Sequence, residues 1–562
     1  MEWLGGFLER YPELALYLAI GLGYLIGGLK IKGFGLGPVT GSLFAGILLG
    51  QFGEIPVSSV AKSILFLLFL FGIGYSVGPQ FLRALKSDGL RPIGLALCVT
   101  VTGLLAAWAV ASILGLDPGF AAGLTSGALT ESPAMGTATE AINSLPLPAE
   151  ERSRLIGHIA VADALCYVFG AFGVIWFCSV LGPKLLGIDL QQEAAKLEAE
   201  LGIERKKLGI ASAWRQFSLR AYRIQGGGPA VGKTVAQAEA LVPNARLFIQ
   251  RIRRGEQILE AQPSEILHAG DVVAVAGRRE VLVEVLGATG SEVEDHELLD
   301  VPVASFDVVL TSKDLAGKTL GEIAPSDALR SLFLRQITRG GQVIPIAPGT
   351  ELQRGDILRV VGLEPVVERA AKFIGPLVRP TEATDFVTLG FAIFLGGVVG
   401  VVIAFPVGNI HISLSTSVGV LLAGLLVGHL RSTHPLFGRI PDGAVSLMTS
   451  LGLAAFVAMT GLHAGPIFVE AVREAGIGLL IGGVFVTLIP QVAGLYFARY
   501  VLRMNPLLIL GGLAGAQTMT AGLAAVQERS GSPIAVLGYT GTVAIGHILL
   551  TTWGAVIVAL TA

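Results

Sequence analysis

Charged residues are scarce in this chain. Only 15% of its 562 residues are Asp, Glu, Lys or Arg, whereas a soluble protein carries roughly 25%. Hydrophobic residues make up 52% and the mean hydropathy is +0.70. This balance excludes an ordinary soluble protein and predicts an integral membrane protein. The net charge of −2 gives no bulk field that would recruit nucleic acid, so no such partner is expected.

Cysteine is nearly absent too. Cys98, Cys166 and Cys178 all lie in apolar runs, and their spacing suggests neither a disulfide framework nor a metal site. No cluster of His, Cys and carboxylate residues has ligand or triad spacing, so we expect no enzyme, no cofactor and no metal. The N-terminus has no basic region and no cleavage site of a signal peptide, so the first apolar run is expected to remain as an anchor.

Long apolar runs are abundant, and they fall into two blocks. Each block contains runs that are long enough to cross a bilayer, near residues 13–31, 35–52, 62–82, 91–115 and 155–181, and near 384–405, 412–430, 443–463, 476–499 and 534–560. A shorter segment rich in Gly and Thr precedes the last run of each block, at 118–142 and 506–526. These two segments are too polar for lipid-facing spans and predict re-entrant hairpins or broken helices.

The two blocks are also similar in sequence. GSLFAGILLG at Gly41–Gly50 matches GVLLAGLLVG at Gly419–Gly428, and GALTESPAMG at Gly127–Gly136 lies opposite GAQTMTAGLA at Gly515–Ala524. Lys and Arg gather in alternate loops, which predicts an odd number of crossings per block, both termini outside the bacterial inner membrane and a cytoplasmic middle domain. The expected fold class is membrane all-α, with two inverted repeats of about five transmembrane helices plus a re-entrant or broken helix each.

The middle of the chain is different in character. Residues 186–219 form a charged connector that we expect to be helical, and β-branched segments then alternate with turn signals. This region is itself duplicated, because VGKTVAQ from Val231 matches AGKTLGE from Ala316. We expect an inserted cytoplasmic α+β domain of two small βαβ-type modules, 220–296 and 297–379, between transmembrane repeats at 1–185 and 380–562.

One motif in the first module suggests a nucleotide site. GGPAVGKT, Gly227–Thr234, satisfies the P-loop pattern. The equivalent stretch of the second module, SKDLAGKT, keeps the GKT and lacks the first Gly. We therefore interpret the shared part as a turn that opens a short helix, and we expect no ATPase.

The chain resembles the aspartate–alanine exchanger family of bacterial transporters in two respects. The first is the repeated permease region, with GxxTxSP in its first half. The second is the pair of central modules, which are similar to TrkA-C (RCK-C) domains. The resemblance covers essentially the whole chain. It implies secondary transport, usually exchange of amino-acid or dicarboxylate anions, an inner-membrane location and a homodimer. It leaves the substrate open among aspartate, alanine, succinate and glutamate.

The two Gly- and Thr-rich segments are the candidate transport site. Unwound backbone and helix N-termini at mid-membrane depth suit a bound carboxylate, and an inverted pair brings two polar tips together. The expected substrate-binding residues are Thr130, Glu131, Ser132, Pro133, Gln517, Thr518 and Thr520. The alternative at this point is that these side chains only hold helices together.

Two further groups complete the predictions. Asp163 and His547 lie in apolar runs and are candidates for ion coupling. Gly78-Pro79 and Gly465-Pro466 occupy matched positions and are expected to kink or break helices. The leading hypothesis is an exchanger of small carboxylates or amino acids in contact with membrane lipid. The alternative is a proton- or cation-coupled antiporter whose modules bind a regulatory ligand.

Overall fold

The computed structural model describes residues 2–29, 37–84, 90–201, 217–242, 247–278, 282–283, 291–300, 303–324, 326, 329, 332–339, 342–378, 383–407, 410–413, 415–433 and 437–562. Contacts divide the chain into a helical unit, Met1–Leu201, Thr338–Pro345 and Pro380–Ala562, and a second unit, Gly202–Ile337 and Ile346–Arg379. Much of the predicted connector, residues 202–216, lies outside the described residues.

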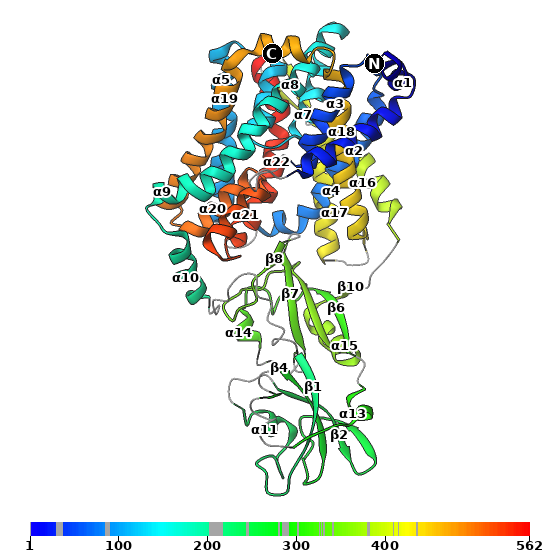
Figure 1. Ribbon diagram of the computed structural model, residues 1–562, viewed down its shortest axis with the longest axis vertical. Coiled ribbons are helices and arrows are strands. Elements are labelled where there is room, and N and C mark those ends of the chain that lie inside the picture. Colours follow the sequence, from blue (N-terminus) through cyan, green and yellow to red (C-terminus); the bar gives the residue numbers. More distant parts are fainter. Residues whose placement is uncertain are drawn as a thin grey trace. The chain divides into compact units, whose positions relative to one another are not determined.

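The first half of the helical unit is a run of helices (Figure 1). They are α1 (Glu2–Arg10), α2 (Pro12–Gly28), α3 (Pro38–Gly50), α4 (Ser59–Ala84), α5 (Leu90–Leu114), α6 (Pro118–Ala128), α7 (Ala134–Ser144), α8 (Ala149–Trp176), the π-helical turn η1 (Phe177–Leu181), α9 (Gly182–Leu186) and α10 (Leu190–Glu200).

The second half also places a pair of short helices before its last long helix, but it has two strands after its first helix and its π-helical turn precedes the short pair. It comprises α16 (Phe386–Val402), the strands β11 (Ala404–Val407) and β12 (Ile410–Ser413), α17 (Thr416–Thr433), α18 (Asp442–Ala464), α19 (Phe468–Tyr496), the π-helical turn η6 (Phe497–Val501), α20 (Pro506–Ala516), α21 (Thr520–Ser530) and α22 (Val536–Thr561). Both chain termini lie at the same end of this helical unit (Figure 1).

Among the described residues, six helices are long and apolar enough to cross a membrane: α4, α5, α8, α18, α19 and α22. A pair of short helices, α6 and α7, lies between α5 and α8, and the pair α20 and α21 lies between α19 and α22. The other predicted spans correspond to the shorter apolar helices α2, α3, α16 and α17. The helices form two bundles. One bundle packs α2, α3 and α4 against α16, α17 and α18, and the other packs α5, α6 and α8 against α19, α20 and α22.

Glycines allow very close packing in the first bundle. A Cβ added at Gly74 would lie 2.2 Å from the carbonyl oxygen of Leu421, and one at Gly78 would lie 2.2 Å from that of Leu425. At Gly78-Pro79 the predicted kink or break does not end the helix, because Pro79 lies inside α4, which continues to Ala84. A proline removes one helical hydrogen bond, and membrane helices tolerate this loss when neighbouring helices hold them in place, as α17 holds α4.

The matched pair behaves differently. α18 ends at Ala464, Gly465 is its C-cap, and α19 begins at Phe468. Gly465-Pro466 therefore lies between two helices. The same motif thus has two structural outcomes.

The described residues between 217 and 378 form two five-stranded sheets. The strand order of the first sheet is β3 (Gln257–Glu260), β2 (Phe248–Arg254), β4 (Val272–Arg278), β1 (Phe217–Arg223) and β5 (Glu292–Val293). The strand order of the second sheet is β10 (Leu377–Val378), β6 (Val303–Val309), β9 (Ile357–Leu363), β7 (Phe333–Arg339) and β8 (Gln342–Ile344). In the first sheet β1 and β2 both pair antiparallel with β4. β1 and β2, the two strands of the expected βαβ unit, are therefore parallel to each other, and the antiparallel strand β4 lies between them in the sheet.

The false P-loop forms a helix cap. The hydroxyl of Thr234 accepts from the N–H of Gln237, and the Gln237 side chain accepts from the N–H of Thr234, which is a capping box at α11 (Val235–Glu239). Thr319 and Glu322 repeat this arrangement at α14 (Leu320–Ile323). The short helices α13 (His296–Leu299) and α15 (Glu364–Ile374) complete the unit.

Candidate functional site

The helix pair α6 and α7 forms a hairpin. A Cβ at Gly119 would lie 2.2 Å from Leu155 O, and one at Gly127 would lie 2.7 Å from Asp163 O. The two contacts advance in the same direction along both helices, so α6 runs parallel to the first half of α8. Because α6 and α8 begin at the same level, α7 and the loop after it must return the chain to that level.

The helix pair α20 and α21 forms the same structure. A Cβ at Gly511 would lie 2.0 Å from Ala535 O, and one at Gly515 would lie 2.6 Å from Tyr539 O. α20 is therefore parallel to the first half of α22, and α21 returns the chain. Each of the four hairpin helices has 11 residues.

The two hairpins enter from opposite ends of their bundle. α5 and α19 are antiparallel, since Gly482 lies against Val110 and Gly494 lies against Val99. α6 follows the end of α5, and α20 follows the end of α19 and η6. Their starting points therefore lie at opposite ends of the α5–α19 pair, and their tips point toward each other.

Both tips end their first helix in a Schellman motif with threonine in the left-handed region. Thr130 has φ 58° and Thr518 has φ 55°. The N–H of Glu131 donates to Ser126 O at 2.8 Å, and the N–H of Met519 donates to Ala514 O at 2.8 Å, at the corresponding positions. This position usually holds glycine. A β-branched residue with positive φ is strained, and such strain is concentrated at functional sites.

The strained threonines connect the hairpins. The hydroxyl of Thr130 donates to the carbonyl oxygen of Gln517 at 2.6 Å. The hydroxyl of Thr518 lies 2.9 Å from the Glu131 carboxylate, to which it donates. Four predicted residues, two from each tip, thus meet directly.

Glu131 is the centre of this meeting point. Its side chain is buried, with 1% of the residue exposed. Besides Thr518, it accepts from the hydroxyl of Thr551 at 3.0 Å and lies 3.2 Å from Nδ1 of His547. Both partners are on α22. The structure therefore places the predicted coupling residue His547 beside the predicted site residue Glu131, and it adds Thr551.

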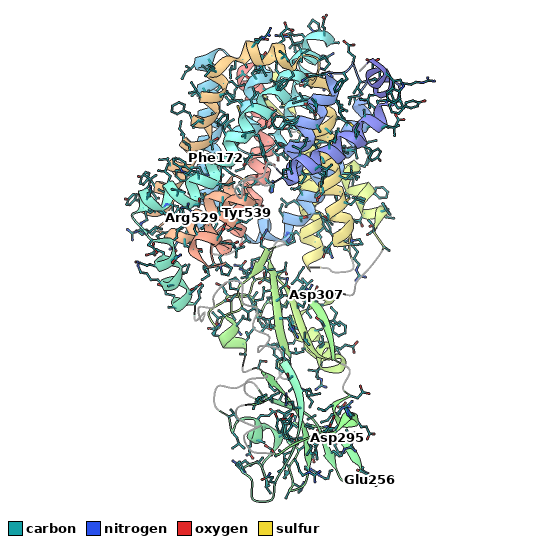
Figure 2. All side chains as sticks on the ribbon, viewed as in Figure 1. Phe172, Glu256, Asp295, Asp307, Arg529 and Tyr539 are labelled. Atoms are coloured by element: carbon teal, nitrogen blue, oxygen red, sulfur yellow. The ribbon has the colours of Figure 1, made fainter. Side chains whose placement is uncertain are left out.

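Asp163 and Tyr539 occupy equivalent positions beside the two hairpins, as their contacts with Gly127 and Gly515 show. The carboxylate of Asp163, 1% exposed, accepts from Ser126 at 2.6 Å and from Ser132. The hydroxyl of Tyr539, labelled in Figure 2, lies 3.0 Å from that of Thr520. Ser132 and Thr520 thus contact the long helices next to the tips.

Gln517 is fully buried, and its side-chain amide is hydrogen-bonded to that of Gln491. The amide nitrogen of Gln491 donates to the amide oxygen of Gln517 at 2.7 Å. The amide nitrogen of Gln517 has no hydrogen-bond partner among the described residues. Pro133, the remaining predicted residue, precedes the first residue of α7.

Sequence reasoning missed Gln491, Thr551 and Glu140. Each is a polar residue in or beside an apolar run, which is the signal that identified Asp163. Glu140 on α7 reaches the other bundle, where its carboxylate accepts from the N–H groups of Thr416 at 2.7 Å and Ser417 at 3.3 Å in the first turn of α17. A carboxylate at a helix N-terminus is stabilising.

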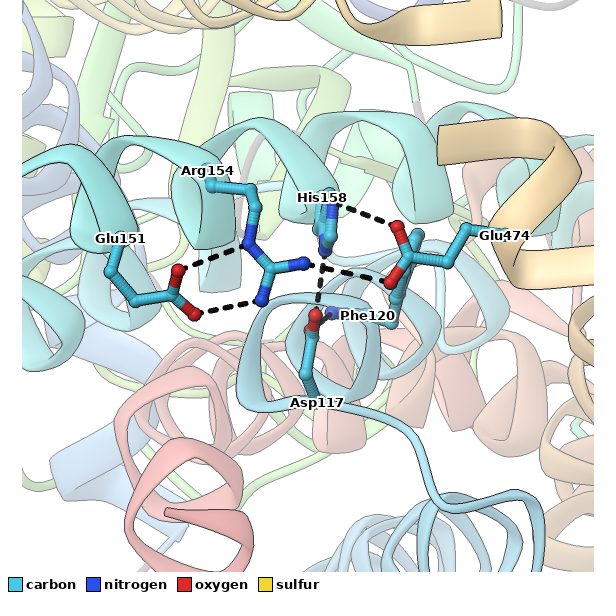
Figure 3. Close-up of polar contacts among 6 residues, drawn as sticks. All are labelled: Asp117, Phe120, Glu151, Arg154, His158 and Glu474. Atoms are coloured by element: carbon cyan, nitrogen blue, oxygen red, sulfur yellow. Dashed lines mark hydrogen bonds and ion pairs between the residues drawn. The ribbon is translucent and has the colours of Figure 1, made fainter. Parts of the chain in front are cut away.

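A second polar cluster lies at the base of the α6 hairpin (Figure 3). Asp117 caps α6 through the N–H of Phe120 and lies 2.7 Å from Nδ1 of His158. Glu474 of α19 lies 3.5 Å from Arg154 and 3.7 Å from Nε2 of His158. This network joins the hairpin to α8 and α19.

Asp117, His158 and Glu474 are also a group whose ligand atoms lie within 4.8 Å of one another, as in metal sites. The guanidinium of Arg154 pairs with Glu474 and with Glu151. A cation beside this guanidinium would be repelled. The cluster is therefore explained by ion pairs.

Comparison with known proteins adds to this geometry. Residues 15–183 and 388–559 match the family model described as a predicted permease membrane region, that of the aspartate–alanine exchangers, and residues 219–286 and 303–375 match the TrkA-C domain. No solved structure matches the chain.

Related proteins match over their whole length. A protein described as an uncharacterized transporter of Bradyrhizobium diazoefficiens is 62% identical over 516 residues, covering 92% of this chain and 100% of the relative. One from Shewanella oneidensis is 40% identical over 99% of both chains. One from Bordetella bronchiseptica is 41% identical over 100% of this chain and 98% of its own.

Proposed function

Because the chain belongs to the aspartate–alanine exchanger family of permeases, with two TrkA-C domains between its permease halves, we propose that it exchanges small amino acids or dicarboxylates across the membrane by alternating access. It is a multi-pass membrane transporter. Both the exchange and the class of substrate exchanged are proposals.

The observation that carries the proposal is the contact between Thr130 and Gln517 at the tips of two hairpins that enter from opposite ends. A site between such tips can be reached from either side when one hairpin moves relative to the other bundle. Alternating access requires a single site of this kind.

The chemistry of the tips suits a carboxylate substrate. The second tip offers the amide nitrogen of Gln517 as a donor. His547 lies beside the buried carboxylate of Glu131. A protonated His547, or the ammonium group of an amino-acid substrate, would balance the negative charge of Glu131.

One observation favours the alternative of a proton-coupled antiporter. Asp163 is buried, and its hydrogen-bond donors are two serine hydroxyls. Carboxylates inside membrane-spanning segments often belong to proton pathways. In this alternative Asp163 carries the coupling proton, and the TrkA-C domains bind a regulatory ligand.

The proposal extends to location and assembly. We place the protein in a bacterial inner membrane as a homodimer, with both termini outside and the TrkA-C domains in the cytoplasm. Single cysteines at Glu2 and Ala562 should then react with an impermeant thiol reagent applied to intact cells. A cysteine at Gly290, which lies outside the described residues, should react only after the cells are opened.

Counterflow in proteoliposomes tests the function. Liposomes preloaded with unlabelled L-aspartate, L-alanine, L-glutamate or succinate are given the same compounds in labelled form. Exchange predicts uptake only when a substrate is inside. Uptake driven by a pH gradient into empty liposomes would instead support the proton-coupled alternative.

A further inference from the structure

Three buried side chains form a chain of hydrogen bonds that ends at the second hairpin tip. The Sγ of Cys178 donates to the amide oxygen of Gln491 at 3.8 Å. The amide nitrogen of Gln491 donates to the amide oxygen of Gln517 at 2.7 Å. Cys178, Gln491 and Gln517 are all fully buried.

The two hydrogen bonds run in the same direction, from Cys178 through Gln491 to Gln517. A glutamine amide has nearly the same shape in either orientation, so its neighbours decide which end points where. In the structure the amide oxygen of Gln491 faces the thiol of Cys178, and its amide nitrogen faces Gln517. The oxygen of Gln517 is then occupied as an acceptor.

One donor is left over. Among the described residues, the amide nitrogen of Gln517 has no partner, although it is buried. A buried donor without an acceptor is costly. The bound substrate is the natural source of an acceptor at the point where the two hairpin tips meet.

We propose that Gln491 is a positioning residue for transport: it orients the amide of Gln517 so that an N–H group, and not a carbonyl oxygen, faces the substrate. A carboxylate oxygen of the substrate accepts from that N–H group. This inference rests on the proposed exchange of carboxylates. Gln491, on α19, would thus help the site to select substrates that carry a hydrogen-bond acceptor, although Gln491 itself does not touch the substrate.

The alternative is that Gln491 only fills space between α19 and α20. The two roles make different predictions for Gln491→Met, which keeps the length of the side chain and removes both polar atoms. Gln491→Glu is the second variant, because an ionised carboxylate accepts only and would turn the amide nitrogen of Gln517 away from the substrate. Gln527→Met is the control, since Gln527 is on the same hairpin and its amide donates to Pro533 O.

The experiment is a counterflow titration of the full-length protein in proteoliposomes. The probe is the acid that the wild type exchanges fastest among labelled L-aspartate, L-alanine, L-glutamate and succinate. We expect Gln491→Met to raise KM several-fold to about tenfold, the size of effect that one hydrogen bond to a charged group gives. The maximal rate should change less than KM, and Gln527→Met should leave both unchanged.

A double-mutant cycle separates positioning from packing. In a Gln517→Ala background, Gln491→Met and Gln491→Glu should have no further effect on KM, because the amide that they orient is gone. An unchanged KM in both Gln491 variants, or an equal KM effect with and without Gln517, would overturn the inference while leaving exchange intact. A wild type that exchanges none of the four acids would overturn the proposed function instead.

Discussion

Thr130 and Thr518 occupy the same position in two helical hairpins, and each donates its hydroxyl to the opposite hairpin. Thr130 donates to Gln517 O, and Thr518 donates to the Glu131 carboxylate. Both have positive φ, which costs a β-branched residue conformational energy. The hydrogen bonds between the tips therefore compensate for backbone strain within them.

This relationship predicts an unusual order of stability at Thr130. Thr130→Ala loses the hydroxyl and keeps a side chain at positive φ, whereas Thr130→Gly loses the hydroxyl and relieves the strain. We expect the alanine variant to be less stable than the glycine variant by about 1 kcal/mol. Thermal unfolding in detergent measures the difference. The usual order for a helix, with alanine more stable than glycine, would show that the backbone at Thr130 is not strained.

Substrate affinity should depend on both hairpins. Ser132→Ala and Gln517→Ala should each weaken apparent affinity several-fold to tens-fold, because a hydrogen bond to a charged group contributes about 1.5–3 kcal/mol. The double variant should be weaker than either. Counterflow titration in liposomes provides the measurement. Wild-type affinity in both single variants, together with loss of transport in Asp163→Asn, would favour the proton-coupled alternative.

Glu140 should stabilise the contact between the two bundles. Its carboxylate accepts from two N–H groups at the start of α17, so Glu140→Ala should lower stability by about 1 kcal/mol. Glu528 is a matched control, because it has the corresponding place in α21 and is exposed. Glu528→Ala should leave the unfolding temperature unchanged. Equal effects of the two substitutions would contradict a specific role for Glu140.

Nucleotide should not affect transport through Lys233. Thr234, next in the P-loop-like sequence, caps a helix of five residues, and Thr319 after Lys318 does the same in the second module. Lys233→Ala and Lys318→Ala should therefore behave alike, with transport independent of added ATP. ATP hydrolysis that disappears only in Lys233→Ala would reinstate the P-loop.

Acid should weaken the first module, 220–296, at Asp295, which is labelled in Figure 2. Hydrogen bonds from the Arg253 guanidinium lower the pKa of this carboxyl from its ordinary value of 3.8. A lowered pKa in the folded state gives stability that is complete above the unfolded pKa and is lost as the pH falls through the folded pKa. The difference in unfolding temperature between wild type and Asp295→Asn should be constant from pH 7 to about 5 and shrink below about pH 4. A constant difference down to pH 3 would contradict the pairing.

The sequence by itself determined the class of protein, the order of its parts and the location of the polar interruptions. Low charge and long apolar runs identify a membrane protein because the bilayer interior excludes charge. The Gly- and Thr-rich segments before the last span of each half predict re-entrant hairpins or broken helices, because lipid-facing helices do not carry such sequences. Thr130 and Thr518 were found in this way.

Only the tertiary structure decided which of these polar groups meet. Glu131, His547 and Thr551 come together because α22 passes the first hairpin tip, and no local pattern records that crossing. The two Gly-Pro pairs have the same sequence, and one lies inside a helix while the other separates two helices. Packing against α17 decides the first case, since contacts between distant helices outweigh the local preference of proline.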